Sequence, residues 1–251
     1  MSHHITEAQD LCYSYPDGHQ ALRGVSFRIH HGESVGVIGG NGAGKSTLLM
    51  LLTGLLEPLR GQVAIGEIRL NSRTAKLVRQ KLGMVFQNPD DQLFMARVEE
   101  DVAFGPRNMK LDEAQVGERV ALALEKVGIV HLGDRAPYRL SAGEKRAAAI
   151  ASVLAMGPDI LIMDEPTSAL DPSSRRRLIN LLKGFEHTKI ITSHDLDMVL
   201  ELCQRVLVLK DGILLCDGPT HQVLSDGNMM IEAGLEVPQS LRGCPSCGWK
   251  G

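Results

Sequence analysis

The chain has 251 residues, about 1.7 times a typical domain of ~150 residues, which predicts one large domain or two smaller ones. Apolar residues make up 43% and charged residues 23% of the chain, and this balance excludes intrinsic disorder, collagen and a disulfide-rich miniprotein. The net charge is −3 and no long basic block occurs. A nucleic-acid partner held through its phosphates is therefore disfavoured.

The beginning of the chain and its cysteines indicate a reducing compartment. Residues 1–7 show no charged segment followed by an apolar one, the pattern of a secretory signal. Five cysteines is an odd number for a disulfide framework, so we expect a cytosolic location. The apolar runs, such as those at 48–52 and 160–163, have at most five residues. This is far shorter than the ~20 residues that cross a bilayer, so we expect no membrane span.

Short apolar runs alternate with amphipathic stretches in the first half of the chain, which predicts an α/β fold. Strict alternation predicts a half-exposed strand over 25–29, and an apolar run before glycines predicts a buried strand over 34–38. A helix is expected over 45–53, where Gly54 can end it. Further strands are expected over 62–70 and 82–86.

The second half of the chain contains the longest predicted helices. Asp112 can cap a helix over 112–127, and Asp171 can cap a helix over 172–183 that has Pro172 in its first turn. A further helix is expected over 142–156. The remaining predicted strands are 160–163, 189–192, 206–209 and 213–216. From about residue 228 the periodicity fades into a tail that contains glycine and proline.

The clearest motif is the glycine-rich segment 39–46, Gly-Gly-Asn-Gly-Ala-Gly-Lys-Ser. It fits G-x-x-x-x-G-K-[ST] and lies between a predicted strand and a predicted helix. Its glycines let successive backbone N–H groups surround a phosphate, and the helix N-terminus adds a positive field. Lys45 would reach the β- and γ-phosphates, and the Ser46 hydroxyl would ligate Mg²⁺. The alternative is a glycine-rich turn without a ligand.

Two adjacent carboxylates follow the predicted strand at 160–163. Asp164 and Glu165 should point to opposite faces, because side chains alternate along a strand. Asp164 fits a Mg²⁺ ligand, and Glu165 fits a base that polarises a water toward the γ-phosphate. Without the phosphate loop, an exposed strand end would explain the two acids equally well.

The helix expected from Ala142 begins directly after Ser141. Ser141 and Glu144 have the spacing of a capping box, S-x-x-E. A helix N-terminus with an exposed Ser141 hydroxyl and Gly143 N–H would also hold a phosphate. The two interpretations are compatible, and the spacing does not choose between them.

Six ATPase motifs follow one another in a fixed order. They are Walker A at 39–47, the Q-loop glutamine Gln87 within 85–92, the signature at 140–144, Walker B at Asp164-Glu165, the D-loop at 168–171 and the switch histidine His194 within 192–195. On this set the chain up to about residue 227 resembles the ATP-binding subunit of ABC transporters. Three runs are most similar to the energy-coupling-factor subgroup for cobalt and nickel uptake, at 88–92, 100–105 and 150–156.

The resemblance implies the P-loop NTPase fold of ABC ATPases. This fold has a RecA-like mixed sheet core, a small antiparallel β subdomain and an α-helical subdomain. The ATP-binding domain would cover residues 1–227, with the helical subdomain at about 88–138. Residues 228–251 would form a C-terminal tail.

The resemblance also implies a role for each motif residue. Tyr15 would stack on adenine, Gln87 would contact Mg²⁺ or the lytic water, and His194 would contact the γ-phosphate and orient the water. A lone histidine after a strand is otherwise a surface or capping residue. The expected catalytic residues are Glu165, His194, Gln87 and Lys45, and the expected Mg²⁺ ligands are Ser46, Gln87 and Asp164. The expected ATP-binding residues are Tyr15, Gly39, Asn41, Gly42, Ala43, Gly44, Lys45, Ser46, Thr47, Ser141, Gly143 and Glu144.

The family encloses two ATP molecules between two such subunits, most simply two copies of this chain. Each phosphate loop then faces the signature of the other subunit, and Asp171 lies near the dimer seam. The signature departs from the family pattern, since Ala142 replaces a glycine and Glu144 replaces a glutamine, while Gly143 is retained. The Glu144 charge near a γ-phosphate bears on how tightly the dimer closes.

The resemblance implies that ATP hydrolysis drives uptake of cobalt or nickel through separate integral membrane subunits, with this chain peripheral at the cytoplasmic face. The segment 88–138 is the expected contact, through Phe94, Met95, Val98 and Phe104; packing within the helical subdomain is the alternative for these side chains. Three other functions remain open: a vitamin importer of the same subgroup, a soluble ABC ATPase acting on DNA or ribosomes, and a nucleotide-binding module without hydrolysis.

The tail contains one C-x-x-C pair, Cys244 and Cys247. One pair is half of a tetrahedral zinc site. A disordered, reduced tail is the leading expectation, with metal binding and a redox pair as alternatives.

Overall fold

The computed structural model describes residues 4–242. The chain divides into two compact units. The first unit is formed by residues up to 78 together with those from 188 onward, and the second unit by residues 79–187. Helix α2 (Ala75–Lys81) crosses from the first unit into the second.

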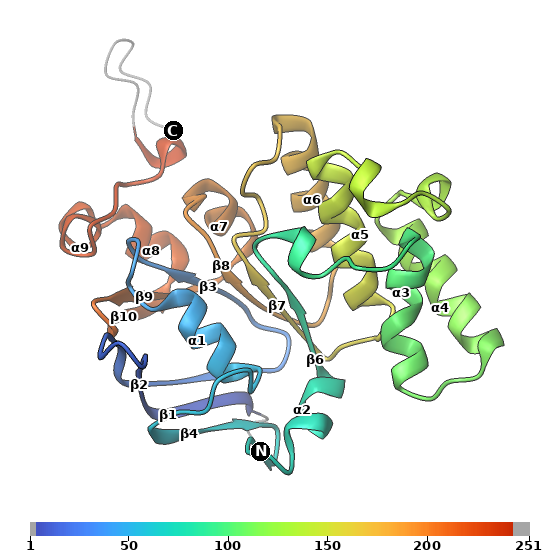
Figure 1. The fold of residues 1–251 in the computed structure, drawn as a ribbon. Helices are drawn as coiled ribbons and strands as arrows, with labels where there is room; N and C mark the ends of the chain where they lie inside the picture. The colour runs from blue at the N-terminus through green and yellow to red at the C-terminus, as the bar shows by residue number, and fades with distance from the viewer. Residues whose placement is uncertain (1–3, 243–251) are drawn as a thin grey trace. The chain divides into compact units, whose positions relative to one another are not determined.

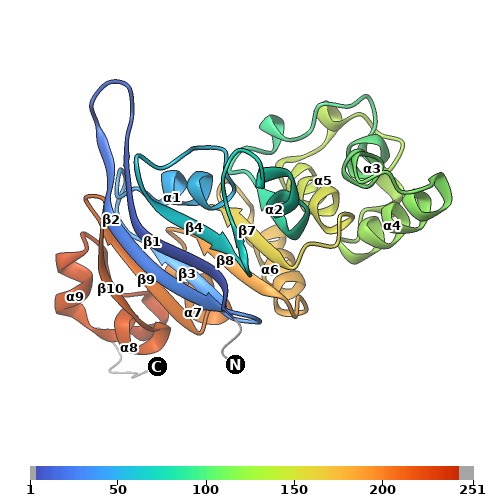
Figure 2. The ribbon, with the colours of Figure 1, turned by 90° about the horizontal axis from the view of Figure 1, so that it is seen from below.

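One sheet of the first unit is antiparallel and has the strand order β2-β1-β4-β5. Its strands are β1 (His4–Ser14), β2 (Gln20–His30), β4 (Arg60–Ile65) and β5 (Ile68–Arg69). Figure 2 shows β1 and β2 as a long hairpin. Strand β1 is absent from the sequence-based prediction. Its alternation is broken by a bulge, since Thr6 and Ala8 are buried, Asp10 has a φ of 49°, and the next buried position is Leu11.

The other strands of the first unit surround β3 (Ser34–Ile38), whose residues are all buried. Strands β8 (Thr188–Thr192) and β9 (Arg205–Lys210) flank β3 and run parallel to it, and β10 (Ile213–Pro219) pairs antiparallel with β9. Helix α1 (Lys45–Leu52) follows β3, and α7 (Leu196–Leu202) follows β8 (Figure 1). The strands predicted at 34–38, 189–192, 206–209 and 213–216 are confirmed, and so is the helix predicted at 45–53.

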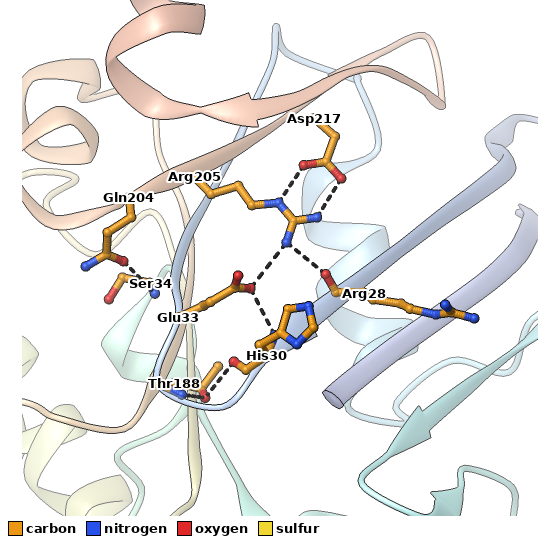
Figure 3. A network of polar contacts seen from close by, with 9 residues as sticks. Arg28, His30, Glu33, Ser34, Thr188, Gln204, Arg205 and Asp217 are labelled. Atoms are coloured by element: carbon orange, nitrogen blue, oxygen red, sulfur yellow. Dashed lines mark hydrogen bonds and ion pairs between the residues drawn. The ribbon is translucent and has the colours of Figure 1, made fainter. Parts of the chain in front are cut away.

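A polar network holds the turn that leads from β2 into β3 (Figure 3). The Glu33 carboxylate accepts from the His30 backbone N–H at 2.9 Å and from Arg205 at 3.2 Å. Arg205 also donates to both carboxylate oxygens of Asp217, at 2.6 and 2.7 Å, and to the Arg28 carbonyl at 3.0 Å. The beginning of β3, which leads to the glycine-rich segment, is therefore fixed by contacts with β9 and β10.

The second unit contains two parallel strands, β6 (Leu82–Val85) and β7 (Ile160–Asp164). Its helices are α3 (Val98–Asn108), α4 (Glu113–Lys126), α5 (Ala142–Leu154) and α6 (Pro172–Lys183) (Figure 1). Helix α3 packs against α4 and α5. The predicted helices over 112–127, 142–156 and 172–183 are confirmed, with Asp112, Ser141 and Asp171 as their N-caps. Helix α3 is not predicted, because Gly105 and Pro106 interrupt its sequence pattern.

The apolar residues expected to face a partner in this unit do not all lie at the surface. Phe94 is 63% exposed and Phe104 is 43% exposed. Their rings meet edge to face, with centroids 5.0 Å apart. Val98 is fully buried, so the expectation of an exposed Val98 is wrong. The reason is that Val98 opens α3 and faces the packed side of that amphipathic helix.

The chain remains ordered beyond the point where its periodicity fades. Helices α8 (Thr220–Ser225) and α9 (Gly227–Glu232) follow β10, and a 3₁₀ turn covers Gln239–Leu241. Asp226 caps α9, whose Met230 is fully buried. These helices are too short for a helical period to be read from the sequence. Cys244 and Cys247 lie outside the described residues.

Within residues 4–242, no helix has both the length and the apolar character required to cross a membrane.

Candidate active site

The glycine-rich segment 39–44 connects β3 to α1 in a conformation that only glycine permits at two positions. Gly39 has a φ of 153°, and a Cβ added there would lie 2.2 Å from the Leu209 carbonyl oxygen. Gly44 has a φ of 101°, and its Cβ would lie 2.5 Å from the Ala21 carbonyl oxygen. The backbone of neighbouring segments therefore packs directly against both ends of the loop. Only glycine leaves room for these close contacts.

Lys45 opens α1 and turns its side chain back onto this loop. The ammonium donates to the Gly39 carbonyl at 2.9 Å and to the Gly40 carbonyl at 3.1 Å, although the residue is only 7% exposed. Its Nζ lies 3.2 Å from Nε2 of His194, which follows β8. An ammonium can donate to that ring nitrogen only when the nitrogen carries no proton. Two residues 149 positions apart, both predicted to contact the γ-phosphate, thus meet at the loop.

Tyr15 directly follows β1, and its side chain reaches the first turn of α1. Its hydroxyl is 3.0 Å from Oγ1 of Thr47, and its ring packs against Tyr13 edge to face at 5.1 Å. The Tyr15 ring is also stacked with His19 at 6.4 Å, a contact for which the sequence gives no signal. Of the remaining loop residues, Asn41 and Gly42 are exposed, Ser46 is half-buried and Ala43 is buried.

The two acidic residues of the second unit occupy the end of β7. Asp164 is the last residue of the strand and is 5% exposed, and Glu165 is 9% exposed. Glu165 has a φ of 46°, so the chain leaves the strand at this residue. The prediction from strand alternation that the two side chains take opposite faces therefore does not apply. A left-handed backbone at a residue other than glycine costs about 1–3 kcal/mol and recurs at active sites.

The residues of the predicted signature form a capping box. The backbone N–H and the hydroxyl of Ser141 both donate to Glu144 Oε2 at 2.8 Å, and Ser141 Oγ accepts from the Glu144 N–H at 3.4 Å. These bonds lower the pKa of the Glu144 carboxyl below its ordinary value. A Cβ at Gly143 would lie 2.6 Å from Ser174 Oγ, so packing against α6 is a second reason for a glycine here.

The loop that precedes α6 is shaped by Asp171. Its carboxylate accepts from the Ser173 and Ser174 N–H groups and from the Ser173 hydroxyl. Hydrogen bonds from Ser174 and Ser173 hold the pKa of Asp171 well below its ordinary value. Ala169, two residues earlier, has a φ of 61°. The D-loop thus leads into α6 through a firmly capped helix N-terminus.

Gln87 is exposed and lies two residues beyond β6. Its backbone is contacted by Arg146 of α5, a residue that no sequence motif singles out. This side chain is 3% exposed and donates to the carbonyls of Phe86, at 2.6 Å, and of Gln87, at 2.5 Å. Burial lowers the pKa of Arg146, and the nearby Asp164 charge opposes that shift. An arginine within an alanine-rich helix carries no sequence signal that would predict this contact.

The donor groups suit a magnesium–triphosphate ligand. Ser46 offers a hydroxyl, Asp164 a carboxylate and Gln87 an amide oxygen, and Mg²⁺ prefers such hard oxygen ligands. Lys45 offers an ammonium, and the loop offers backbone N–H groups at a helix N-terminus, both of which suit phosphate oxygens. Ser46 belongs to the first unit, and Gln87 and Asp164 belong to the second.

Comparisons with known proteins agree with this chemistry. The sequence model of the family described as ABC transporter matches residues 22–168. A Geobacter sulfurreducens protein that carries the name of an ABC transporter ATP-binding protein is 59% identical over 248 residues, which are 99% of this chain and 100% of that protein. The energy-coupling factor transporter ATP-binding protein EcfA of Methanothermobacter thermautotrophicus is 47% identical, over 94% of this chain and 78% of its own length.

Solved structures show the same fold. CbiO1 of Clostridium perfringens, described as part of the ABC transporter complex cbiONQ, superimposes with a TM-score of 0.81 at 39% identity, over 91% of this chain and 94% of that one. The ATP-binding cassette MJ0796, solved as a dimer with ADP and phosphate, has a TM-score of 0.79 at 27% identity, over 86% and 99% of the two chains. The expected ABC ATPase fold, with a mixed α/β sheet and a helical subdomain, is confirmed. This chain therefore belongs to the ABC transporter ATP-binding proteins, the ATP-hydrolysing components of these transporters.

Proposed function

We propose that this chain is the ATP-binding subunit of an energy-coupling-factor importer and that it drives uptake of cobalt or nickel through separate membrane subunits. The relative named EcfA and the structural neighbour from the cbiONQ complex support the transporter type. The metal cargo rests on the resemblance of the runs 88–92, 100–105 and 150–156. The observation that carries the ATPase itself is the contact between Lys45 and His194 at the glycine-rich loop.

The first unit would bind the nucleotide. Lys45 would exchange its bonds to the Gly39 and Gly40 carbonyls for the β- and γ-phosphate oxygens. His194, already 3.2 Å from the Lys45 ammonium, would then face the γ-phosphate and orient the attacking water. Tyr15 would stack on adenine. The remaining contacts of the triphosphate would come from the loop and the first turn of α1, at Gly39, Asn41, Gly42, Ala43, Gly44, Ser46 and Thr47.

The second unit would supply the base. Glu165 is 9% exposed, and it directly follows β7 with a left-handed backbone. Its carboxylate would accept a proton from the attacking water. Mg²⁺, when held by Ser46, Asp164 and Gln87, would neutralise charge that develops on the phosphate oxygens.

Two copies of the chain would enclose two ATP molecules. Each nucleotide would be completed by Ser141, Gly143 and Glu144 of the second copy, with Asp171 near the seam. The dimeric cassette MJ0796 supports this arrangement. Nucleotide held between subunits favours the closed dimer, and loss of the γ-phosphate removes that free energy, so hydrolysis opens it. In the capping box the Ser141 hydroxyl donates to the Glu144 carboxylate. This hydrogen bond would have to break before the hydroxyl could donate to a phosphate.

The membrane subunits would dock on the helical part of the second unit, within the proposed subdomain at 88–138. The exposed aromatic pair of Phe94 and Phe104 supports this position. The ATP-binding domain would then cover 1–227, with 228–251 as an appended segment. In such a complex this chain would lie at the cytoplasmic face of the membrane as a peripheral subunit.

Hydrolysis and pairing can be tested with Glu165→Gln. Removing the base should lower the ATPase rate by ~10²–10⁴, while ATP should hold the variant as a dimer in sedimentation velocity. The matched control is Glu118→Gln, the same chemical change at an exposed position of α4. Unchanged turnover of the Glu165 variant would contradict its assignment as the base, and a monomer with bound ATP would contradict the homodimer.

Cargo and partners require the assembled complex. We expect the tagged chain to co-purify from detergent-solubilised membranes with a small multispanning subunit. In liposomes, that complex should take up radiolabelled cobalt or nickel only with ATP and intact Glu165. ATP-dependent vitamin uptake without metal uptake would favour the vitamin importer. Recovery with DNA or ribosomes, and no membrane protein, would favour the soluble ATPase.

A further inference from the structure

We propose that Arg146 and Gln92 are positioning residues that join the segment 86–92, which carries Gln87, to helix α5, which begins at the signature. The two segments then behave as one rigid piece, and the position of Gln87 depends on α5. This inference rests on the proposed role of Gln87 in hydrolysis and adds the residues through which that role is maintained.

Arg146 binds the beginning of the segment. It occupies the second turn of α5, two residues after Glu144, and its two terminal nitrogens each donate to a different backbone carbonyl, those of Phe86 and Gln87. The guanidinium presents its donors in a planar fork, so two adjacent carbonyls are held in one fixed orientation. Arg146 binds the Gln87 carbonyl directly. This contact restricts the position of the Gln87 backbone and therefore the range of positions that its side chain can reach.

Gln92 closes the segment at its other end. Its Oε1 accepts from the Phe86 N–H at 3.2 Å, which brings the end of the segment back to its beginning. Its Nε2 donates to the Ala149 carbonyl at 2.7 Å and to the Ser152 hydroxyl at 3.0 Å, both on α5. The Gln92 amide therefore holds the two ends of the loop together and also attaches the loop to α5. Inside the loop, Asn88 caps the short turn Pro89–Asp91.

The burial of Arg146 argues for a role other than stability. The residue is 3% exposed, and its Nε has no hydrogen-bond partner among the described residues. Its two bonds go to neutral carbonyls rather than to a carboxylate. Burying a guanidinium in this way costs free energy that an apolar side chain of similar volume would not cost. What the arginine supplies in return is a defined geometry for two successive peptide groups.

The field of Asp164 reaches the same guanidinium. The Asp164 charge favours the cationic form of Arg146 and so opposes the lowering of its pKa by burial. Arg146 thus links two of the motif segments directly, because it belongs to the helix of the signature and binds the loop of Gln87. A displacement of α5 would move the Gln87 backbone with it.

The test compares steady-state hydrolysis by the purified chain with Gln92→Glu and Arg146→Lys. Gln92→Glu keeps the acceptor for the Phe86 N–H and replaces the donor to α5, whereas Arg146→Lys keeps the charge and removes the fork. For both we expect kcat per nucleotide-binding site to fall about 10- to 100-fold, as displacement of a catalytic group by about 1 Å does. Affinity for a fluorescent ATP analogue without Mg²⁺ should change by no more than about twofold.

A double-substitution cycle shows whether the effect passes through Gln87. Gln87→Ala alone should lower kcat, and neither Gln92→Glu nor Arg146→Lys should lower it further in that background. The control is Asp90→Asn, which removes only the exposed ion pair with Lys145 on the same loop and helix, and it should leave kcat unchanged. If Arg146→Lys fails to fold, Gln92→Glu carries the test by itself.

Two results would overturn the inference and leave the proposed function standing: additive losses in the Gln87→Ala background, or an unchanged kcat per binding site together with a lower melting temperature. The second result would mean that the contacts serve stability alone. If Gln87→Ala itself leaves kcat unchanged, the role proposed for Gln87 is wrong, and this inference falls with it.

Discussion

Arg205 offers the most direct test of how the polar network of the first unit supports the site. Arg205→Ala removes two bonds to Asp217, one to Glu33 and one to the Arg28 carbonyl (Figure 3). Two carboxylates then lose the cation between them, and the turn that leads into β3 loses its side-chain bonds to Arg205 of β9. The glycine-rich loop begins directly after β3, so both stability and nucleotide binding respond to this change.

The magnitude follows from the exposure of the three side chains. Arg205 is 24% exposed, Asp217 29% and Glu33 30%, so solvent screens the network only in part. A hydrogen bond to a charged group contributes about 1.5–3 kcal/mol when buried, and an exposed ion pair about 0.2–1 kcal/mol. Between these limits we expect Arg205→Ala to lower the free energy of unfolding by about 3 kcal/mol, which for a chain of this length lowers Tm by about 6–12 °C.

The assay is urea unfolding followed by far-UV circular dichroism, together with thermal melting at low and high salt. Arg205→Lys retains the charge and loses the fork, so we expect about half the effect. A double-mutant cycle with Asp217→Ala should give a coupling free energy of at least about 1 kcal/mol. A total loss below about 0.5 kcal/mol would refute the reasoning, because the network would then behave like a screened surface pair.

Three further predictions concern single positions. Gly39→Ala should destabilise the chain by about 3 kcal/mol or more and abolish nucleotide binding, because its Cβ would lie 2.2 Å from the Leu209 carbonyl; a wild-type melting curve would contradict this. The Asp101 carboxylate accepts from two backbone N–H groups, and burial raises its pKa. The stabilisation that this shift gives to the folded state is therefore fully present below about pH 4, and it is lost as the pH rises through the folded-state pKa. The unfolding free energy of wild type minus that of Asp101→Asn should therefore fall from pH ~4 toward neutrality, and urea titrations that give a flat difference would refute the shift. Asp112→Ala removes the capping box with Gln115 and should cost about 1 kcal/mol, measured by urea unfolding, whereas Asp112→Asn should retain most of the stability.

The motif residues could be placed from sequence because their signals are local. A glycine-rich turn between an apolar run and a helix leaves few backbone solutions, and Gly39, Gly44 and Lys45 occupy the expected one. Helix caps are equally local, and Asp112, Ser141 and Asp171 all accept from the N–H groups of their own helices.

The errors arise where packing overrides the local pattern. Strand β1 escapes prediction because the bulge at Asp10 shifts its buried face by one residue. Helix α3 tolerates Gly105 because a Cβ there would lie 2.5 Å from the Met156 side chain, so the glycine permits close packing against the segment that follows α5. Glu165 leaves the strand in a left-handed conformation that no residue pattern announces.

The sequence by itself determined the family, the order of the six motifs and the residue types of an ATPase site, because each depends on neighbours within a few positions. Tertiary structure alone decided that Lys45 lies 3.2 Å from His194, that Arg146 holds the backbone of Gln87 and that Arg205 anchors the approach to β3. These contacts join residues 59 to 172 positions apart. Distances of that kind depend on the packing of whole strands and helices, and a short-range pattern carries no information about them.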